Sequence, residues 1–253
     1  MIETLPGPMP GHKQVSVPKF TGAPVSNQKS INASPIDRIQ ENLLARAERR
    51  LLNRLCACMP SWVVPDILTA IGMLGALVIF SGYILSNLGD GWLWISIAGY
   101  FIHWFGDSMD GSLARYRKIE RPRYGYFLDH SCDGLATTLI VVGIGLSRYV
   151  QLEVALVALA GYLLLSIHAF LLVRVLGEMK LSYAYAGPTE LRVFLIVLTM
   201  AMIAAGSRPV LFGALTWFDL VVGGIGALLV VFFVIQTLRT AKRLAVEEPR
   251  RRP

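Results

Sequence analysis

The sequence has little charge for its length. Only 16% of its 253 residues are Asp, Glu, Lys or Arg, whereas 54% are hydrophobic. Soluble domains carry about 25% charged residues. The shortage of charge therefore excludes an ordinary soluble protein and predicts an integral membrane protein.

Cysteine is also scarce, and the three that occur are Cys56, Cys58 and Cys132. An odd number of cysteines predicts no disulfide framework, and Cys56 and Cys58 lack the further ligands that a structural zinc site needs. We find no repeat of 20 to 50 residues, which excludes a solenoid. The net charge is +7, but the basic residues stand in short runs between apolar stretches. This pattern is typical of anchoring beside a membrane and predicts no nucleic-acid partner.

Four regions differ in composition. Residues 1–33 are rich in Pro, Gly, Ser and Lys, without hydrophobic periodicity or a signal-peptide core, which predicts a disordered cytoplasmic tail. Residues 34–57 begin with a Ser-Pro helix start and repeat apolar and arginine side chains at helical spacing, which predicts an interfacial amphipathic helix. A solvated helix docked on a partner is the alternative. Residues 60–240 form the predicted membrane domain, and residues 241–253 a basic cytoplasmic tail.

The membrane domain contains six apolar segments of the length that spans a bilayer, about 20 residues. They cover residues 64–86, 92–113, 125–147, 152–176, 190–206 and 210–236. The predicted fold class is therefore an all-α membrane protein with six transmembrane helices and an N-terminal interfacial amphipathic helix.

Basic residues are distributed unevenly between the connections of these segments. On one side the connections hold Arg115, Arg117, Lys118, Arg121, Arg123, Arg174, Lys180 and Arg192. On the other side they hold only Arg148 and Arg208. Because cytoplasmic loops carry the excess of Lys and Arg, both termini are expected in the cytoplasm.

Four aspartates interrupt the apolar pattern at the cytoplasmic end of the second and third segments. Asp107 and Asp110 are three residues apart and Asp129 and Asp133 are four apart, so each pair shares one helix face. A charge inside a membrane costs about 2.5–3.5 kcal/mol, and four of them require a counter-charge. Oxygen ligands without His or Cys, converging from two antiparallel helices, predict a site for one or two Mg²⁺ or Mn²⁺ ions.

The residues that follow the first aspartate pair suit a phosphate ligand. Gly111 and Ala114 leave the backbone open to a ligand, and Arg115 can pair with a phosphate. Divalent cations beside an arginine and a small-residue surface predict a diphosphate ligand.

The same residues carry a resemblance to a known family. The segments DSMDGSLAR at 107–115 and GYFLDHSCD at 125–133 match the signature DxxDGxxAR…GxxxDxxxD of the CDP-alcohol phosphotransferase family. The segment PSWVVPDILT at 60–69 is similar to the stretch before the family's first helix, with Asp66 at the usual position of an Asn. The resemblance implies a six-helix fold, a homodimer and an active site open to the cytoplasm and the membrane.

The resemblance also implies a reaction and roles for single residues. An acceptor hydroxyl would attack the β-phosphate of a CDP-linked donor, and CMP would leave. Asp133 would act as general base. The implied metal ligands are Asp107, Asp110, Asp129 and Asp133. The implied CDP-binding residues are Asp66, Thr69, Asp107, Gly111, Ala114 and Arg115.

Two substrate classes remain open. The segments at 128–138 and 181–190 are similar to the choline/ethanolamine branch of the family, which joins a CDP-aminoalcohol to diacylglycerol. The six-helix length resembles bacterial members that join CDP-diacylglycerol to a small polar alcohol, and we favour this class and a bacterial inner membrane over the endoplasmic reticulum. Five basic residues could form a pocket for a phosphorylated acceptor, or their positions could reflect only the positive-inside rule. They are Arg121, Arg123, Arg174, Lys180 and Arg192.

Other polar residues leave further alternatives. A divalent-cation transporter is a distant one, because Asp90, Glu153 and Asp219 are too scattered to continue a path across the membrane. His103 and His168 are expected to be satisfied interior histidines. His130 could share the role of base, but one residue after Asp129 it points to a different helix face, which favours a structural or hydrogen-bonding role. Glu178 and Glu190 could contact an acceptor, and solvated loop ends are the favoured alternative.

Overall fold

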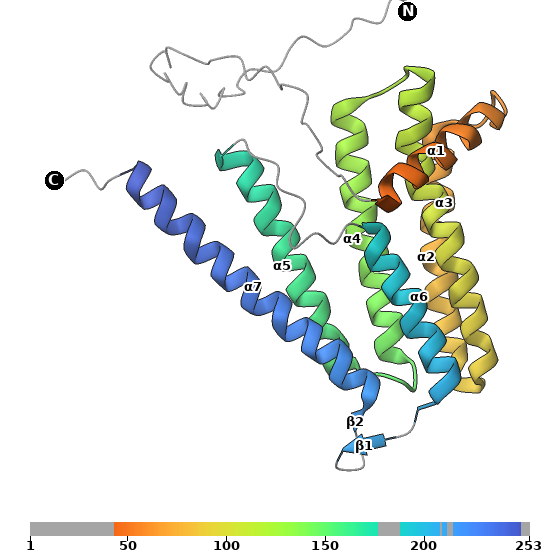
Figure 1. The fold of residues 1–253 in the computed structure, drawn as a ribbon, viewed down its shortest axis with the longest axis vertical. Coiled ribbons are helices and arrows are strands. Elements are labelled where there is room, and N and C mark those ends of the chain that lie inside the picture. The colour runs from red at the N-terminus through yellow and green to blue at the C-terminus, as the bar shows by residue number, and fades with distance from the viewer. Residues whose placement is uncertain (1–42, 177–187, 208, 212–214, 249–253) are drawn as a thin grey trace, which may run out of the picture. The chain divides into compact units, whose positions relative to one another are not determined.

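A computed structural model describes residues 43–176, 188–207, 209–211 and 215–248 (Figure 1). The predicted tail at 1–33, the first part of the predicted amphipathic helix, Glu178 and Lys180 lie outside these ranges. The long elements are α1 (Leu43–Cys58), α2 (Pro65–Leu85), α3 (Leu93–Arg117), α4 (Pro122–Leu146), α5 (Leu152–Leu176), α6 (Pro188–Ala205) and α7 (Trp217–Glu247). The short elements are the 3₁₀ turns at Ser86–Leu88 and Asp90–Trp92 and the strands β1 (Pro209–Leu211) and β2 (Leu215–Thr216).

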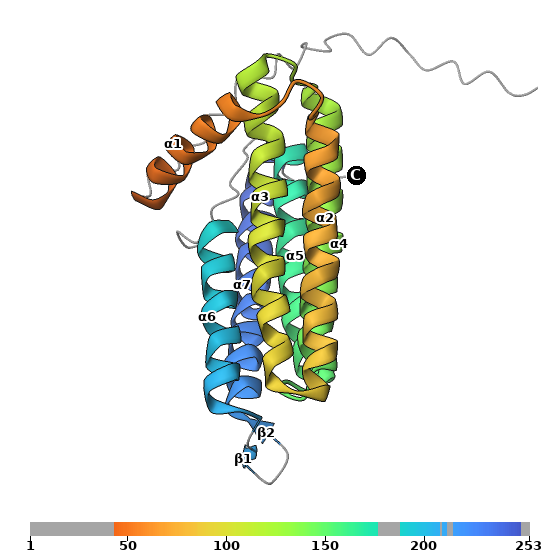
Figure 2. The ribbon, with the colours of Figure 1, turned by 90° about the vertical axis from the view of Figure 1, so that its right-hand side faces the viewer.

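The helices α2, α3 and α4 lie side by side (Figures 1 and 2). Pro65 starts α2 and Pro122 starts α4, each in the first turn, where a proline removes no helical hydrogen bond. Two 3₁₀ turns reverse the chain between α2 and α3. Residues 118–121 reverse it again before α4, and Lys118 ends α3 with a left-handed φ of 56°. This short connection brings the two halves of the aspartate motif to the same end of the helices.

Glycines let the backbones of α2 and α3 touch beside the aspartates. A Cβ atom built on Gly106 would lie 2.5 Å from the carbonyl oxygen of Leu68 and 2.6 Å from Cα of Gly72. A Cβ on Gly72 would lie 3.2 Å from the backbone nitrogen of Asp107. Small residues of this kind are common where membrane helices approach closely. The contact fixes the depth of Asp107 relative to α2.

Buried hydroxyl groups tie the middle of the bundle together. The Tyr83 hydroxyl on α2 lies 3.1 Å from that of Tyr100 on α3 and 2.7 Å from Thr199 Oγ1 on α6. These side chains are fully buried in a core of apolar residues. A buried hydroxyl without a partner would be costly, so the three side chains select one arrangement of α2, α3 and α6.

The start of α7 corrects one predicted boundary. The apolar run beginning at residue 210 is not one helix, because β1 and β2 form a two-stranded antiparallel pair before it. The helix starts at Trp217 because Thr216 and Asp219 form a capping box, in which each side chain accepts the other's backbone N–H. Asp219 also accepts a hydrogen bond from the backbone of Gln151, which joins α7 to the start of α5. α7 runs to Glu247, into the segment predicted as the basic tail.

A second acidic residue at that end of the molecule has a structural partner. Asp90 accepts hydrogen bonds from Arg148 and from the Tyr149 hydroxyl. The hydrogen bond from Tyr149, together with Arg148, lowers the pKa of the Asp90 carboxyl. Asp90 therefore stays ionised and binds the turn before α3 to the connection between α4 and α5.

The helix α1 packs through one face on α2 and α3. Leu52 and Cys56 are buried in a cluster with Leu68, Met109 and Leu113. Other side chains of α1 are exposed, including those of Arg49, Arg50 and Arg54. Its placement in a membrane interface stays a prediction.

The connection from α1 to α2 is held by Arg117 near the end of α3. Its guanidinium group donates hydrogen bonds to the carbonyl oxygens of Val63, Pro60 and Met59, at 2.5, 2.8 and 3.1 Å. Arg117 therefore has a structural role in addition to any contribution to the positive-inside pattern.

Among the residues that the structure describes, four helical segments are long and apolar enough to cross a membrane: residues 65–88, 122–146, 152–176 and 217–247. The segments that the sequence predicts as the second and fifth spans are also helices, α3 and α6. α3 carries Asp107 and Asp110, and α6 carries Glu190 and Arg192 in its first turns.

The close contact of α2 and α3 can be tested with one methyl group. We expect Gly106→Ala to lower the free energy of unfolding by about 1–3 kcal/mol, because the added Cβ meets backbone atoms that cannot move aside. Gly224→Ala is the matched control, since a Cβ there meets nothing within 4 Å. Thermal unfolding in detergent measures both, and equal stability of the two variants would contradict the packing.

Candidate metal centre

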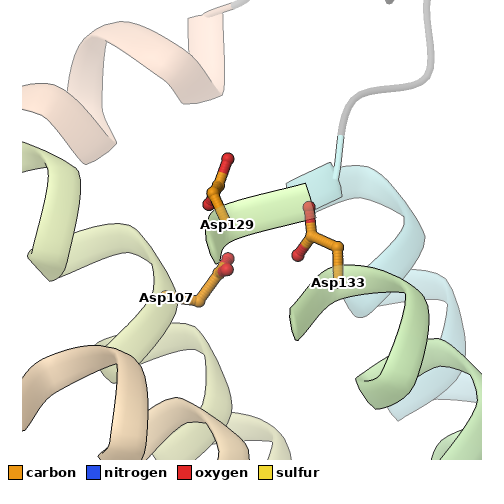
Figure 3. A group of neighbouring side chains, drawn as sticks. All are labelled: Asp107, Asp129 and Asp133. Atoms are coloured by element: carbon orange, nitrogen blue, oxygen red, sulfur yellow. The ribbon is translucent and has the colours of Figure 1, made fainter. Parts of the chain in front are cut away.

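Three carboxylates converge at the end of α3 and α4 that lies near their connection. Asp107 on α3 and Asp129 and Asp133 on α4 each offer an oxygen, and these oxygens all lie within 4.8 Å of one another. Figure 3 shows the three side chains around one shared space. None of the three is fully buried. Two antiparallel helices therefore deliver the converging acidic groups that the sequence predicts.

Asp110 borders the same cavity but is held differently. Its carboxylate accepts a hydrogen bond of 2.6 Å from Thr69 Oγ1 on α2 and one from the backbone nitrogen of Gly111. It is not among the three aspartates whose oxygens converge most closely. All four predicted ligands therefore border one cavity. Asp110 differs from the other three because it is hydrogen-bonded to Thr69 on α2. The sequence links Thr69 to the nucleotide, whereas the structure shows it orienting Asp110.

His103 was expected to be a satisfied interior histidine, and this expectation is wrong for one ring atom. Its side chain is only 7% exposed and borders the cavity one helical turn from Asp107. Within the described part of the chain, its buried Nδ1 has no hydrogen-bond partner. The remaining lining comes from Gly72, Met73 and Cys132.

An arginine from α6 supplies part of the counter-charge that four aspartates need. Arg192 pairs directly with Asp107, and the two side chains are only 12% and 24% exposed. The sequence places Arg192 among five candidate cations for an acceptor phosphate and does not identify its partner. One signal in the sequence could have identified Arg192: it is a basic residue in the first turns of a helix that is otherwise apolar.

The predicted nucleotide residues lie on both sides of this cluster. The Arg115 guanidinium lies over Gly111, at 3.2 Å from the position that a Cβ would take. Asp66 is paired with Arg121 through both carboxylate oxygens, at 2.5 and 2.7 Å, on an exposed part of the surface. Arg121 also stacks on the Tyr124 ring at 3.9 Å. Asp66 therefore has a partner within the chain, which the sequence did not predict.

His130 lies beside Asp129 and between two aromatic side chains. Its Nδ1 lies 2.9 Å from the Tyr126 carbonyl oxygen and 3.4 Å from Asp129 Oδ2. Its ring packs between Tyr126 and Phe170, with centroids at 4.2 and 5.2 Å. These contacts agree with the structural or hydrogen-bonding role that the sequence favours for it.

The donor atoms around the cavity fit a hard divalent cation. All four acidic groups offer carboxylate oxygens, which suit Mg²⁺ and Mn²⁺, and no thiolate is needed. Among the described residues, three carboxylates lie within 4.8 Å of one another and one arginine pairs with them, which leaves excess negative charge at this end of the helices. A divalent ion would remove that excess.

Comparison with known proteins gives the same region a family. The CDP-alcohol phosphatidyltransferase family matches residues 62–239, which is more than half of the chain. Cholinephosphotransferase 1 of Danio rerio is 28% identical over 127 residues, 45% of this chain and 33% of that protein. Phosphatidylinositol phosphate synthase of Cutibacterium acnes is 34% identical over 91 residues, 36% of this chain and 41% of that protein. The matches thus span less than half the length of either relative.

The metal centre can be tested without any reaction. We expect purified protein to bind Mn²⁺, and Asp129→Asn to weaken that binding by about tenfold or more, because it removes one charged ligand. Asp90→Asn, at the other end of α3, removes a carboxylate of the same type and should leave the affinity unchanged. Electron paramagnetic resonance of free Mn²⁺ measures both, and equal affinities of the two variants would contradict the assignment.

Proposed function

Because the chain belongs to the CDP-alcohol phosphatidyltransferase family, we propose that it transfers a phosphoalcohol group from a CDP-linked donor to an acceptor hydroxyl, with release of CMP. The observation that carries this proposal is the convergence of Asp107, Asp129 and Asp133, which belong to both halves of the signature motif. A motif split between two helices becomes one site only in this arrangement.

Asp107, Asp110, Asp129 and Asp133 would hold one or two Mg²⁺ or Mn²⁺ ions. The bound ions would neutralise the donor diphosphate and the charge that develops on the departing CMP. Asp133 accepts the proton of the acceptor hydroxyl, whose oxygen forms a bond to the β-phosphorus. The bond between that phosphorus and the CMP oxygen breaks, and CMP carries the electron pair away.

The CDP moiety would bind across α3 and the start of α2. Arg115 lies over Gly111, and Ala114 is half-buried on the same helix, so a charged group faces a small-residue surface. Thr69 contributes by holding Asp110. Asp66 would contribute together with Arg121, as an ion pair at the exposed end of α2.

The donor that we favour is CDP-diacylglycerol and the acceptor a small polar alcohol. Arg192 is a cation beside the aspartates and suits an acceptor that carries a phosphate. The similarity to a phosphatidylinositol phosphate synthase supports this choice. The similarity to a cholinephosphotransferase supports the alternative, in which a CDP-aminoalcohol reacts with diacylglycerol.

The membrane arrangement that we propose has six spans, with α3 and α6 added to the four apolar helices. Both termini and the aspartates face the cytoplasm, in a bacterial inner membrane, and two chains form a homodimer. A cation transporter is disfavoured, because Asp90 and Asp219 at the other end are engaged with Arg148, Tyr149 and Thr216. These acids do not continue a cation path through the described helices.

An assay of CMP release tests the proposed reaction. Purified protein with Mn²⁺ is incubated with CDP-diacylglycerol, or with CDP-choline and diacylglycerol, against a panel of alcohols that includes phosphorylated ones. We expect CMP release with CDP-diacylglycerol, loss of release in EDTA, and a decrease of about a hundredfold or more in Asp133→Asn. Asp90→Asn is the control and should keep its activity.

The outcomes separate the alternatives. Release only with CDP-choline and diacylglycerol would replace the favoured donor by the aminoalcohol class. Release that survives both EDTA and Asp133→Asn would contradict the roles given to the metal and the base.

A further inference from the structure

Glu48 on α1 joins two other helices near the aspartate cluster. Its Oε1 accepts a hydrogen bond of 2.7 Å from the Trp104 indole nitrogen and a longer one of 3.4 Å from Ser108 Oγ, both on α3. Its Oε2 accepts one of 3.0 Å from Thr189 Oγ1 in the first turn of α6. One half-buried carboxylate therefore links α1, α3 and the beginning of α6.

Two of the residues that Glu48 contacts are close in sequence to residues of the site. Ser108 directly follows Asp107 on α3. Thr189 precedes Arg192 by three residues, so both lie on one side of the first turns of α6. The Arg192–Asp107 pair is a second bridge between the same two helices. The position of Arg192 over the aspartates thus depends on where the start of α6 is held.

The chemistry of Glu48 suits this holding task better than a neutral side chain would. A carboxylate has two acceptor oxygens and can serve donors from two directions, whereas a glutamine has one acceptor oxygen. Hydrogen bonds to a charged acceptor are also stronger than those between neutral groups. An ordinary solvated glutamate on a basic helix would not need three donors from two other helices.

We propose that Glu48 is a positioning residue that holds the start of α6 against α3 and so keeps Arg192 at the aspartate cluster. It acts through Thr189 and Arg192, and it touches no substrate. This inference rests on the proposed function for its catalytic consequence, although the structural link stands on the contacts alone. It also connects the basic helix α1 to the site.

The structural link is tested by the distance between two spin labels. Labels at Val193→Cys on α6 and Leu77→Cys on α2 occupy exposed positions, and Cys58 and Cys132 are replaced by Ser in every sample. We expect Glu48→Gln to broaden the distance distribution about twofold, because fewer contacts then hold the first turn of α6. An unchanged distribution would overturn the proposal.

Matched variants separate positioning from a general loss of stability. Thr189→Val should broaden the distribution as Glu48→Gln does, whereas Thr189→Ser keeps the hydroxyl and should restore the narrow distribution. Glu247→Gln removes the same charge from an exposed pair with Arg243 and should have no effect. Broadening by Thr189→Ser or Glu247→Gln as well would contradict a specific role of the Glu48–Thr189 bond.

The catalytic consequence is tested with the donor and acceptor that give CMP release. We expect Glu48→Gln to lower kcat by about tenfold, since small misplacements of a charged group are costly. The double variant Glu48→Gln/Arg192→Gln should be no slower than Arg192→Gln alone within about twofold, because both changes act on one element. Additive losses would show that Glu48 does not act through Arg192.

The two proposals fail in different ways. If the wild type releases no CMP with any substrate pair, the proposed function is wrong and the spin-label distances still decide the role of Glu48. If the wild type is active and Glu48→Gln changes neither distances nor kcat, the positioning role is wrong and the proposed function stands.

Discussion

Mutual repulsion of carboxylates in a poorly polar environment is the constraint on which the rest of the structure depends. Asp107, Asp129 and Asp133 bring three acidic groups within 4.8 Å of one another, and Arg192, the arginine paired with them in the described part of the chain, carries one positive charge against three. Such a cluster persists only where its repulsion is offset by a bound cation or by the packing that holds it. The surrounding structure supplies the packing, and the donor atoms suit the cation.

Several separate contacts hold the cluster in place. The glycine contact between α2 and α3 fixes the depth of Asp107, and the short connection after Lys118 returns α4 so that its aspartates reach the same level. Thr69 turns Asp110 toward α2. Arg192 and Glu48 bind the start of α6 across α3. The site is thus built from the consecutive helices α2, α3 and α4 together with the start of the more distant α6, and short polar or backbone contacts fix each of them.

Much of this arrangement could be predicted from the sequence, because it depends on local spacing. The three- and four-residue intervals of the aspartates give the shared helix faces directly, and the apolar lengths give the helices. The separate position of Asp110 could not be predicted, since it depends on how α3 is rotated against α2. The start of α7 was missed because apolar content hid the Thr216–Asp219 capping box. The partners of Glu48 lie 56, 60 and 141 residues away, and no local pattern connects them.

The central claim is that the aspartates of α3 and α4 share a divalent cation. Anomalous scattering from crystals grown with Mn²⁺ tests it most directly, because the signal locates the metal without reference to any reaction. We expect manganese density about 2.1 Å from oxygens of Asp107, Asp129 and Asp133. Manganese bound elsewhere, with Asp107 still paired to Arg192 and no density between α3 and α4, would contradict it.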